Sequence, residues 1–255
     1  MDFLIAADTD IGNTRKTNQD SVAVMVADMG SVPVAFGVIC DGMGGLAKGE
    51  LASATMIHSM TAWFRNDFPS MYRSGMEDGA IRDVWTSIIR RNNEAIQSYG
   101  AANQLSLGTT ISAILITPER YYIVNVGDTR IYEIGSTVKQ LTDDQTVVAQ
   151  ELRYGRITPE QAENDPRGSV LLQCVGASRV VNPEFFFGAP LQNATYLLCS
   201  DGFRHKIGNA EIMDFFNAAI NTDADIMKTH IRQLIELNKQ KQEKDNITAA
   251  LIRTF

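Results

Sequence analysis

Five aspartates of this sequence share a local setting that could support metal chemistry. Three of them close an apolar, strand-like run, and the other two stand just before one. Carboxylates gathered at the ends of neighbouring strands repel one another, so they need a cation between them. Oxygen ligands favour hard ions such as Mg²⁺ or Mn²⁺ over zinc. The five are Asp20, Asp41, Asp128, Asp201 and Asp245.

Each feature has a simpler explanation when it is taken alone. An Asp-Gly pair such as Asp41-Gly42 is more often a turn, because Gly tolerates positive φ and Asp bonds its own backbone. Glycines at positions 42, 44 and 45 allow close approach to a metal or phosphate, or they simply form a loop. Arg15 alone would be a solvated charge. Five such aspartates in 255 residues nevertheless favour a metal site.

The elements that would position these acids come in runs of strands and pairs of helices. Segment 77–99 is the clearest helix, because its apolar residues recur at spacings of three and four. This order differs from the strand–helix alternation of a parallel sheet, and it predicts an α+β fold with antiparallel sheets. Short helices and loops are expected at 143–168, and tight connections between strands at 118–120 and 127–129. Strands are expected at 3–7, 21–27, 34–40, 110–116, 121–126, 130–134, 181–187, 196–199 and 246–253, and helices at 50–66, 77–99, 210–219 and 224–239.

Composition narrows the classes of protein. Hydrophobic residues make up 44% and charged residues 21%, which excludes a disordered, collagen-like or coiled-coil chain. The net charge of −7 and the pI of about 5.0 disfavour a nucleic-acid binder. The longest apolar run, residues 32–40, is too short to cross a bilayer, and residues 1–12 lack the basic start of a signal peptide. The three cysteines are expected to be reduced thiols of a cytoplasmic protein.

A series of short motifs runs from about residue 8 to residue 253, and each is weak alone. They are Arg15-Lys16-Thr17-Asn18-Gln19-Asp20, Asp41-Gly42-Met43-Gly44-Gly45 with Gly49-Glu50 and Ala52-Ser53, Gly108-Thr109-Thr110, Val126-Gly127-Asp128-Thr129-Arg130, Leu141-Thr142-Asp143-Asp144, Val175-Gly176, Cys199-Ser200-Asp201-Gly202 and Asp245-Asn246-Ile247-Thr248. Their order and spacing together resemble the metal-dependent protein phosphatases, the type 2C serine/threonine (PPM) family, in its bacterial form.

The resemblance implies a fold and a cellular role. The fold would be an α-β-β-α sandwich of two antiparallel sheets flanked by helix pairs. Residues 1–255 would form a single domain, with a flap-like segment at about 143–176. The protein would be a cytoplasmic, monomeric signalling enzyme that acts on phosphorylated proteins and opposes a serine/threonine kinase. No nucleic-acid or membrane partner is expected.

The resemblance also implies roles in a centre of two Mn²⁺ or Mg²⁺ ions. Asp41 would bridge the ions, and the Gly42 carbonyl would bind one of them. Asp201 and Asp245 would bind the other ion. Asp20 would support the site directly or through water.

The remaining roles concern the reaction. A hydroxide shared by the two ions would attack phosphorus in line with the departing serine or threonine oxygen, with Asp41 and Asp201 as catalytic residues. Arg15 matches the arginine that binds the substrate phosphate and offsets its charge. Asp128 matches a position that helps to hold a third ion with Asp201.

The sequence departs from the family pattern in four places. Gln19 stands where many members have Glu, and Met43 replaces a His that follows Asp-Gly in some members. A thioether cannot donate a proton, so general-acid help must come from water or elsewhere. Gln145 and Asp165 replace histidines in or beside the flap-like segment. These two replacements are expected to affect flap behaviour and substrate preference more than catalysis. Three histidines are interpreted as non-catalytic: His58, His205 and His230.

Two other functions compete with this interpretation. A haloacid-dehalogenase-like phosphatase would use Asp8 of Asp8-Thr9-Asp10 as nucleophile, but Gly12 stands where Thr or Val is expected and the order of elements disagrees. A catalytically weak or inactive phosphoprotein-binding module on the same fold would be expected to lose metal-binding acids. Asp41, Asp201 and Asp245 are all present, which favours the enzyme.

Overall fold

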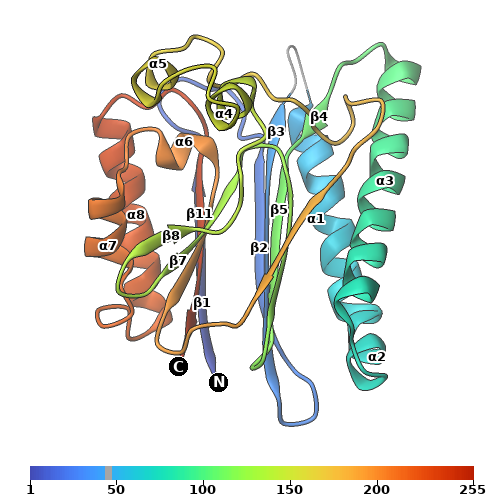
Figure 1. The fold of residues 1–255 in the computed structure, drawn as a ribbon, viewed down its shortest axis with the longest axis vertical. Coiled ribbons are helices and arrows are strands. Elements are labelled where there is room, and N and C mark those ends of the chain that lie inside the picture. Colours follow the sequence, from blue (N-terminus) through green and yellow to red (C-terminus); the bar gives the residue numbers. More distant parts are fainter. Residues whose placement is uncertain (44–47) are drawn as a thin grey trace.

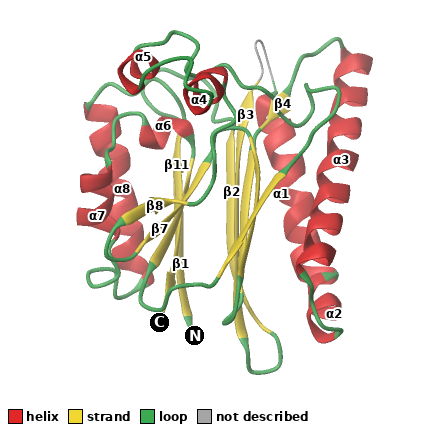
Figure 2. Ribbon diagram, in the orientation of Figure 1, coloured by secondary structure: helices red, strands yellow, loops and turns green. Residues whose placement is uncertain are grey.

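A computed structural model describes residues 1–43 and 48–255. Two antiparallel sheets lie face to face, and helices cover the outer face of each (Figures 1 and 2). This arrangement confirms the predicted α-β-β-α sandwich. Gly44 and Gly45 of the Asp-Gly-x-Gly-Gly pattern lie outside the described residues.

The first sheet contains strands from both ends of the chain, in the order β1-β11-β10-β7-β8. The second has the order β2-β3-β5-β6-β9, with β4 paired to β3. The strands are β1 (Phe3–Asp10), β2 (Asp20–Asp28), β3 (Pro33–Met43), β4 (Gly108–Thr109), β5 (Ile111–Ile116), β6 (Tyr121–Val126), β7 (Arg130–Ile134), β8 (Val138–Gln140), β9 (Glu184–Gly188), β10 (Thr195–Cys199) and β11 (Ile247–Thr254).

The helices divide between the two faces of the sandwich. The long helices α1 and α3 pack on the second sheet, and α7 and α8 pack on the first (Figure 1). Two short helices, α4 and α5, lie above the sheets. The helices are α1 (Gly49–Asn66), α2 (Phe68–Arg73), α3 (Asp78–Asn103), α4 (Val147–Arg153), α5 (Pro159–Glu163), α6 (Asp201–Arg204), α7 (Asn209–Phe216) and α8 (Ala224–Gln240).

Three apolar layers hold these elements together. One lies between α1, α3 and the second sheet, and another between α7, α8 and the first sheet. The third fills the space between the sheets with side chains such as Ile39, Ile114 and Ile252. Gly37 of β3 belongs to this inter-sheet contact, because a Cβ there would come within 3.1–3.2 Å of Ile252 and Leu198. The two sheets are therefore closely packed against each other at Gly37, with little room for a larger residue.

Most expected elements appear within a few residues of their predicted bounds, but several short ones were not predicted. These are α2, α6, β4 and β8. The expected strand at 181–187 begins later, at Glu184. The connection at 127–129 is short as expected, yet it joins strands of different sheets, since β6 and β7 do not pair with each other. Asp223 caps the start of α8, because its side chain accepts a hydrogen bond from the Ile226 N–H (2.8 Å).

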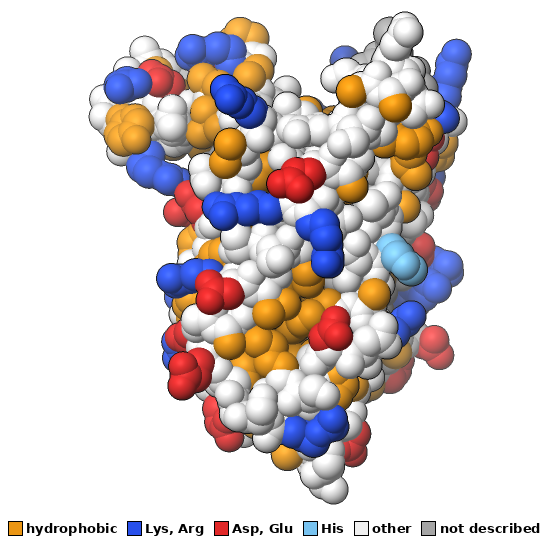
Figure 3. Space-filling model, turned by 90° about the vertical axis from the view of Figure 1, so that its right-hand side faces the viewer, with side chains coloured by type: hydrophobic (Ala, Val, Ile, Leu, Met, Phe, Trp, Pro, Cys, Tyr) orange, Lys and Arg blue, Asp and Glu red, His pale blue; other side chains and the backbone are white. Residues whose placement is uncertain are grey.

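The helix-covered side of the second sheet mixes charges of both signs. Seen from that side, acidic and basic side chains are interspersed around a hollow lined with apolar groups (Figure 3). A nucleic-acid surface would instead gather basic residues on one face. Among the described helices, none is both long and apolar enough to cross a membrane.

Candidate active site

A cavity of about 310 Å³ gathers acidic residues from both sheets. It lies where β3, the β6–β7 connection, the start of α6 and the segment before β11 meet. The cavity contains every predicted site residue except Asp20. Its lining residues are Arg15, Gln19, Asp41, Gly42, Met43, Asp128, Ser169, Leu171, Asp201 and Asp245.

Asp20 and Asp41 are direct partners across the β2–β3 ladder. Asp20 lies behind the cavity and is 9% exposed, and its Oδ2 accepts a hydrogen bond from the Thr248 hydroxyl (2.6 Å). Opposite residues of antiparallel strands have Cβ atoms only about 5 Å apart. Asp20 is therefore placed to influence Asp41 rather than to face the cavity.

The backbone around Asp41 is fixed by two threonines. The Asp41 N–H donates to Thr110 Oγ1 (2.9 Å), and the Asp41 carbonyl accepts from the Thr110 N–H (2.9 Å) and the Thr109 hydroxyl (3.0 Å). Both threonines belong to the Gly-Thr-Thr motif, for which the sequence had offered no role. They hold the end of β3 so that its carboxylate points from a rigid strand end.

Asp201 and Asp245 come from two segments that touch through a glycine. Asp201 begins α6 and Asp245 precedes β11. A Cβ on Gly202 would lie 2.2 Å from the Asn246 carbonyl oxygen, so only glycine permits this approach. The Asp-Gly pair at 201–202 is thus required by close packing of two acid-bearing segments.

Arg15 forms an ion pair with Asp245 at the mouth of the cavity. Its Nη2 lies 2.6 Å from Asp245 Oδ2, and its side chain is half exposed. The hydrogen bond to Asp245 raises the pKa of Arg15 further above its ordinary value. Arg15 is therefore a charged group already directed at the acids, rather than a solvated charge.

Gln19 contacts the carbonyl that was predicted to bind a metal. With its amide oriented to satisfy both neighbours, Gln19 donates to the Gly42 carbonyl (3.2 Å) and accepts from the Gly49 N–H (3.0 Å). A Cβ on Gly42 would lie 2.3 Å from the Gly49 carbonyl, so a side chain has no room there. The backbone of Gly42 is therefore tightly held beside Asp41.

The donor set suits hard divalent cations. The cavity offers carboxylates and a backbone carbonyl, and the buried Asp201 Oδ1 has no hydrogen-bond partner. Burial, followed by the charges of Asp20 and Asp201, raises the pKa of Asp41 well above its ordinary value. Burial also raises the pKa values of Asp20 and Asp128 to about 7. A cation would relieve this repulsion.

The acids do not yet surround a common point. Within residues 1–43 and 48–255, no three His, Cys, Asp or Glu side chains form an arrangement that could hold an ion as they stand. Cationic side chains account for part of this. Arg15 holds Asp245, and Arg204 lies 3.4 Å from Asp128. These acids would have to rearrange to hold an ion together.

His205, which the sequence analysis interpreted as non-catalytic, and Glu243, which it did not identify, are neighbours of the site. His205 Nε2 lies 3.5 Å from Asp201 Oδ2, and its Nδ1 lies 3.5 Å from Glu243 Oε2. Glu243 Oε1 accepts from the N–H groups of Lys244 (2.8 Å) and Asp245 (3.0 Å). One buried carboxylate thus braces both acid-bearing segments. The spacing of Glu243 two residues before Asp245 was the available signal.

A second network surrounds Asp128. Arg130 binds Asp144 with two hydrogen bonds of 2.7 and 2.6 Å, and Arg204 lies 3.4 Å from both Asp128 and Asp144. The Gln145 side chain accepts from the Gly127 N–H (2.9 Å), so it fixes the residue before Asp128. Gln145, which stands in place of a histidine, therefore joins the base of segment 143–176 to the site.

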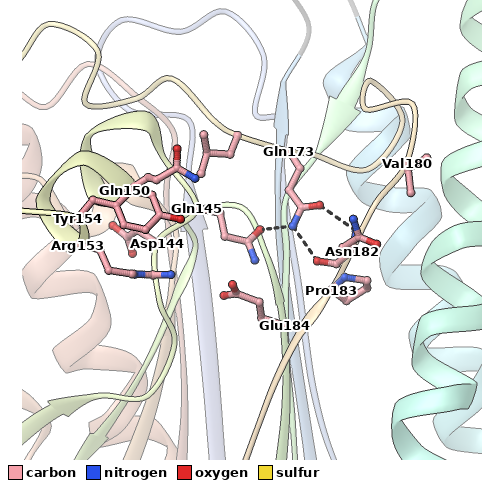
Figure 4. A pocket seen from close by; sticks show the side chains of 11 residues that line it. Asp144, Gln145, Gln150, Arg153, Tyr154, Gln173, Val180, Asn182, Pro183 and Glu184 are labelled. Carbon is pink, nitrogen blue, oxygen red and sulfur yellow. Dashed lines mark hydrogen bonds between the residues drawn. The ribbon is translucent and has the colours of Figure 1, made fainter. Parts of the chain in front are cut away.

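A larger hollow of about 560 Å³ lies beneath that segment, between α4 and the start of β9. Gln173 spans its wall by donating to Gln145 (2.9 Å) and to the Asn182 carbonyl (2.8 Å), and Glu184 lies below them (Figure 4). Four of its eleven lining residues are amides, and the acids of the smaller cavity are absent from it. We assign the chemistry to the smaller cavity.

The other polar candidates lie elsewhere. Asp8 lies within β1 and pairs with Arg232 (2.6 Å), and the antiparallel sheet gives it none of the surroundings of a dehalogenase-like nucleophile. His230 hydrogen-bonds Asn221 (3.0 Å), and His58 is exposed on α1. Asp165 is bound by Arg167, which lowers its pKa to about 2.

We expect the metal-free protein to lose stability as the pH rises from about 4 to about 7. The carboxyls of Asp20 and Asp128 have pKa values of about 7 in the folded state, against 3.8 ordinarily. Within this window the folded state binds more protons than the unfolded state. The free energy of unfolding should then fall by up to about 1.4 kcal/mol per pH unit for each group. His205, whose pKa is raised above 6.5, adds to the loss of stability only at the upper end of this window and beyond it.

Thermal unfolding of EDTA-treated protein across this range measures the effect. The melting temperature should decline towards neutral pH, and saturating Mn²⁺ should restore it most strongly near pH 7. A melting temperature that rises or stays level over the window would contradict the raised pKa values.

Comparisons with known proteins agree with this geometry. Residues 13–246 match the family model of protein phosphatase 2C. The chain is 30% identical over 251 residues to the serine/threonine phosphatase stp of Listeria welshimeri, covering 96% of this chain and 93% of that protein. It superposes on the S. agalactiae serine/threonine phosphatase with a TM-score of 0.85 at 28% identity, covering 99% and 100% of the two chains. It also resembles the catalytic domain of the serine threonine protein phosphatase PstP in complex with two manganese ions, with a TM-score of 0.79 at 28% identity and coverage of 98% and 97%.

Proposed function

The chain belongs to the protein phosphatase 2C family, and we propose that it hydrolyses phosphoserine and phosphothreonine in proteins with two divalent cations. It is a metal-dependent protein serine/threonine phosphatase, and its named relatives are serine/threonine phosphatases. The observation that carries the proposal is the convergence of four carboxylates and Arg15 on one cavity.

We assign the two ions to the residues that can close around them. Asp41 and Gly42 line the cavity from β3, and Asp201 and Asp245 line it from segments attached to the other sheet. Asp20 supports Asp41 from behind. Mn²⁺ or Mg²⁺ suits this oxygen-only set, and the PstP structure contains two manganese ions.

The protein's own groups prepare the substrate. Arg15 leaves its ion pair with Asp245 and binds the phosphoryl group of the substrate. Its planar guanidinium can donate hydrogen bonds to two phosphoryl oxygens at once. Asp41 and Asp201, the proposed catalytic residues, orient the attacking water from opposite sheets. Leu171 and Ser169 narrow the cavity from segment 143–176. The bound cations supply charge neutralisation and the acidification of water that makes a hydroxide available near neutral pH.

Further parts of the proposal concern organisation and context. Residues 1–255 act as one domain, with 143–176 as a flap over the site. The protein works as a cytoplasmic monomer on phosphoproteins made by a serine/threonine kinase. The buried, free cysteines Cys40, Cys174 and Cys199 support a reducing compartment. The family resemblance also implies a third ion at Asp128 with Asp201, but the Arg204 guanidinium lies 3.4 Å from the Asp128 carboxylate.

The test is hydrolysis of phosphoserine and phosphothreonine peptides with Mn²⁺, with Mg²⁺ and with EDTA. We expect turnover with either ion and none above background with EDTA. An inactive phosphoprotein-binding module would bind the peptides equally under all three conditions without releasing phosphate, and that result would overturn the proposal.

Met43 gives a prediction about the leaving group. Met43 lines the cavity and cannot donate a proton. Met43→His should therefore raise phosphopeptide turnover, by at most the roughly 10²–10⁴-fold that general acid catalysis supplies. Para-nitrophenyl phosphate turnover should stay nearly unchanged, because its leaving group needs little protonation.

Met43→Gln serves as the control, because it is polar and similar in length but cannot act as a general acid. Equal losses on both substrates would mean that Met43 only packs. An equal gain on para-nitrophenyl phosphate would rule out the general-acid explanation.

A further inference from the structure

Arg204 places a fixed positive charge beside Asp128. It ends α6, the one-turn helix that Asp201 begins, so both residues come from the same element. Its side chain is 13% exposed. Its Nη2 lies 3.4 Å from Asp128 Oδ2 and 3.2 Å from the Asp128 carbonyl oxygen. A nearly buried guanidinium therefore contacts two oxygens of the residue expected to hold a third ion.

Opposite charges meet around this contact, and Asp201 adds a further carboxylate to it. Asp144 is bound by Arg130 through two short hydrogen bonds, and it lies 3.4 Å from Arg204. Two carboxylates, Asp128 and Asp144, thus face two guanidinium groups, Arg130 and Arg204. Because Arg130 already forms two hydrogen bonds with Asp144, the positive charge of Arg204 can act mainly on the Asp128 carboxylate.

A divalent cation at Asp128 would meet Arg204 at short range. Like charges a few ångströms apart in a buried site repel strongly, because little solvent screens them. The ion could enter only if Arg204 left, and its guanidinium would then lose both carboxylates. The residues at Asp128 consequently do not fit a third ion while Arg204 keeps its place.

We infer that Arg204 takes the place of a third cation at Asp128, so that the protein binds two divalent ions and its third site is closed by its own guanidinium. This inference rests on the proposed two-metal function. Arg204 is then a positioning residue: it holds Asp128 and ties it to Asp144 at the base of segment 143–176. The 3.2–3.4 Å contacts between Arg204 and Asp128 are longer than the usual charge-assisted hydrogen bond. A guanidinium that neutralises a carboxylate does not need the shorter distance, because charges also attract at this range.

Calorimetric titration of metal-free full-length protein with Mn²⁺ tests the inference without measuring activity. The wild type should bind two ions. Arg204→Gln removes the charge and should create a third site at Asp128, at least about tenfold tighter than any third binding by the wild type. Arg204→Lys keeps a positive charge and should bind two ions, and Arg204→Gln with Asp128→Asn should return to two.

Asp128→Asn alone provides a test that needs no change at Arg204. If Arg204 closes the site, this variant should still bind two Mn²⁺ ions. Three ions in the wild type with loss of one in Asp128→Asn would overturn the inference, as would two ions in a folded Arg204→Gln. These results would leave the two-metal proposal standing. A wild type that binds no Mn²⁺ would instead overturn both.

Discussion

Asp201→Ala should lower phosphopeptide turnover by at least about 10³-fold. Asp201 faces the cavity from the start of α6, and its Oδ1 is buried without a hydrogen-bond partner. A bound cation stabilises the transition state by several kcal/mol, and each 1.36 kcal/mol corresponds to a factor of ten in rate. Loss of this ligand should weaken Mn²⁺ binding as well as turnover.

The metal-free variant should fold at least as well as the wild type. Removing one of several crowded carboxylates relieves repulsion, which offsets the lost contact with His205. Asp214→Ala, at an exposed position on α7, is the matched control and should keep full activity and metal affinity. An unchanged kcat at saturating Mn²⁺ would exclude Asp201 from the site.

Arg15→Ala should reduce kcat/KM by about 10²-fold. Charge-assisted hydrogen bonds from a guanidinium to phosphate contribute up to about 3 kcal/mol. The loss should fall on KM if Arg15 contacts ground state and transition state equally, and on kcat as well if the contact tightens during attack. Arg15→Lys should recover only part of the loss, because an ammonium cannot grip two oxygens in one plane.

Arg232→Ala is a matched control for this variant. Arg232 also pairs with an aspartate at 2.6 Å, and its side chain is 63% exposed, but it lies outside the cavity. We expect its kcat/KM to stay within about twofold of the wild type, as for ordinary surface pairs. A kcat/KM for Arg15→Ala as high as that of this control would return Arg15 to the role of a solvated charge.

Local patterns were sufficient for the long elements. β6 and β7 have the bounds that their apolar runs predict, and α3 follows its three-and-four spacing. The short elements carried no such signal. β8 has only three half-buried or exposed residues, and α2 is six residues long with a proline in its first turn. Nothing local could show that the short connection at Asp128 passes from one sheet to the other.

The site was predictable to the extent that its residues lie in motifs. The aspartates stand at strand ends, and their order matches the family. The supporting residues depend on contacts between distant parts of the chain, such as Asn238 against the Phe203 carbonyl or His205 against Glu243. Arg204 follows a motif that ends at Gly202, and only the fold brings it to Asp128.

The tight inter-sheet contact at Gly37 has a consequence for ion selection. Asp41 stands on one sheet, whereas Asp201 and Asp245 stand on segments attached to the other. The distance between these carboxylates therefore depends on the thickness of the apolar layer that separates the two sheets. Mg²⁺ requires oxygens at about 2.0–2.1 Å and tolerates little error, whereas larger ions accept longer and more variable distances. We therefore expect Gly37, Leu198 and Ile252, which lie outside the lining of the cavity, to contribute to the preference among ion radii.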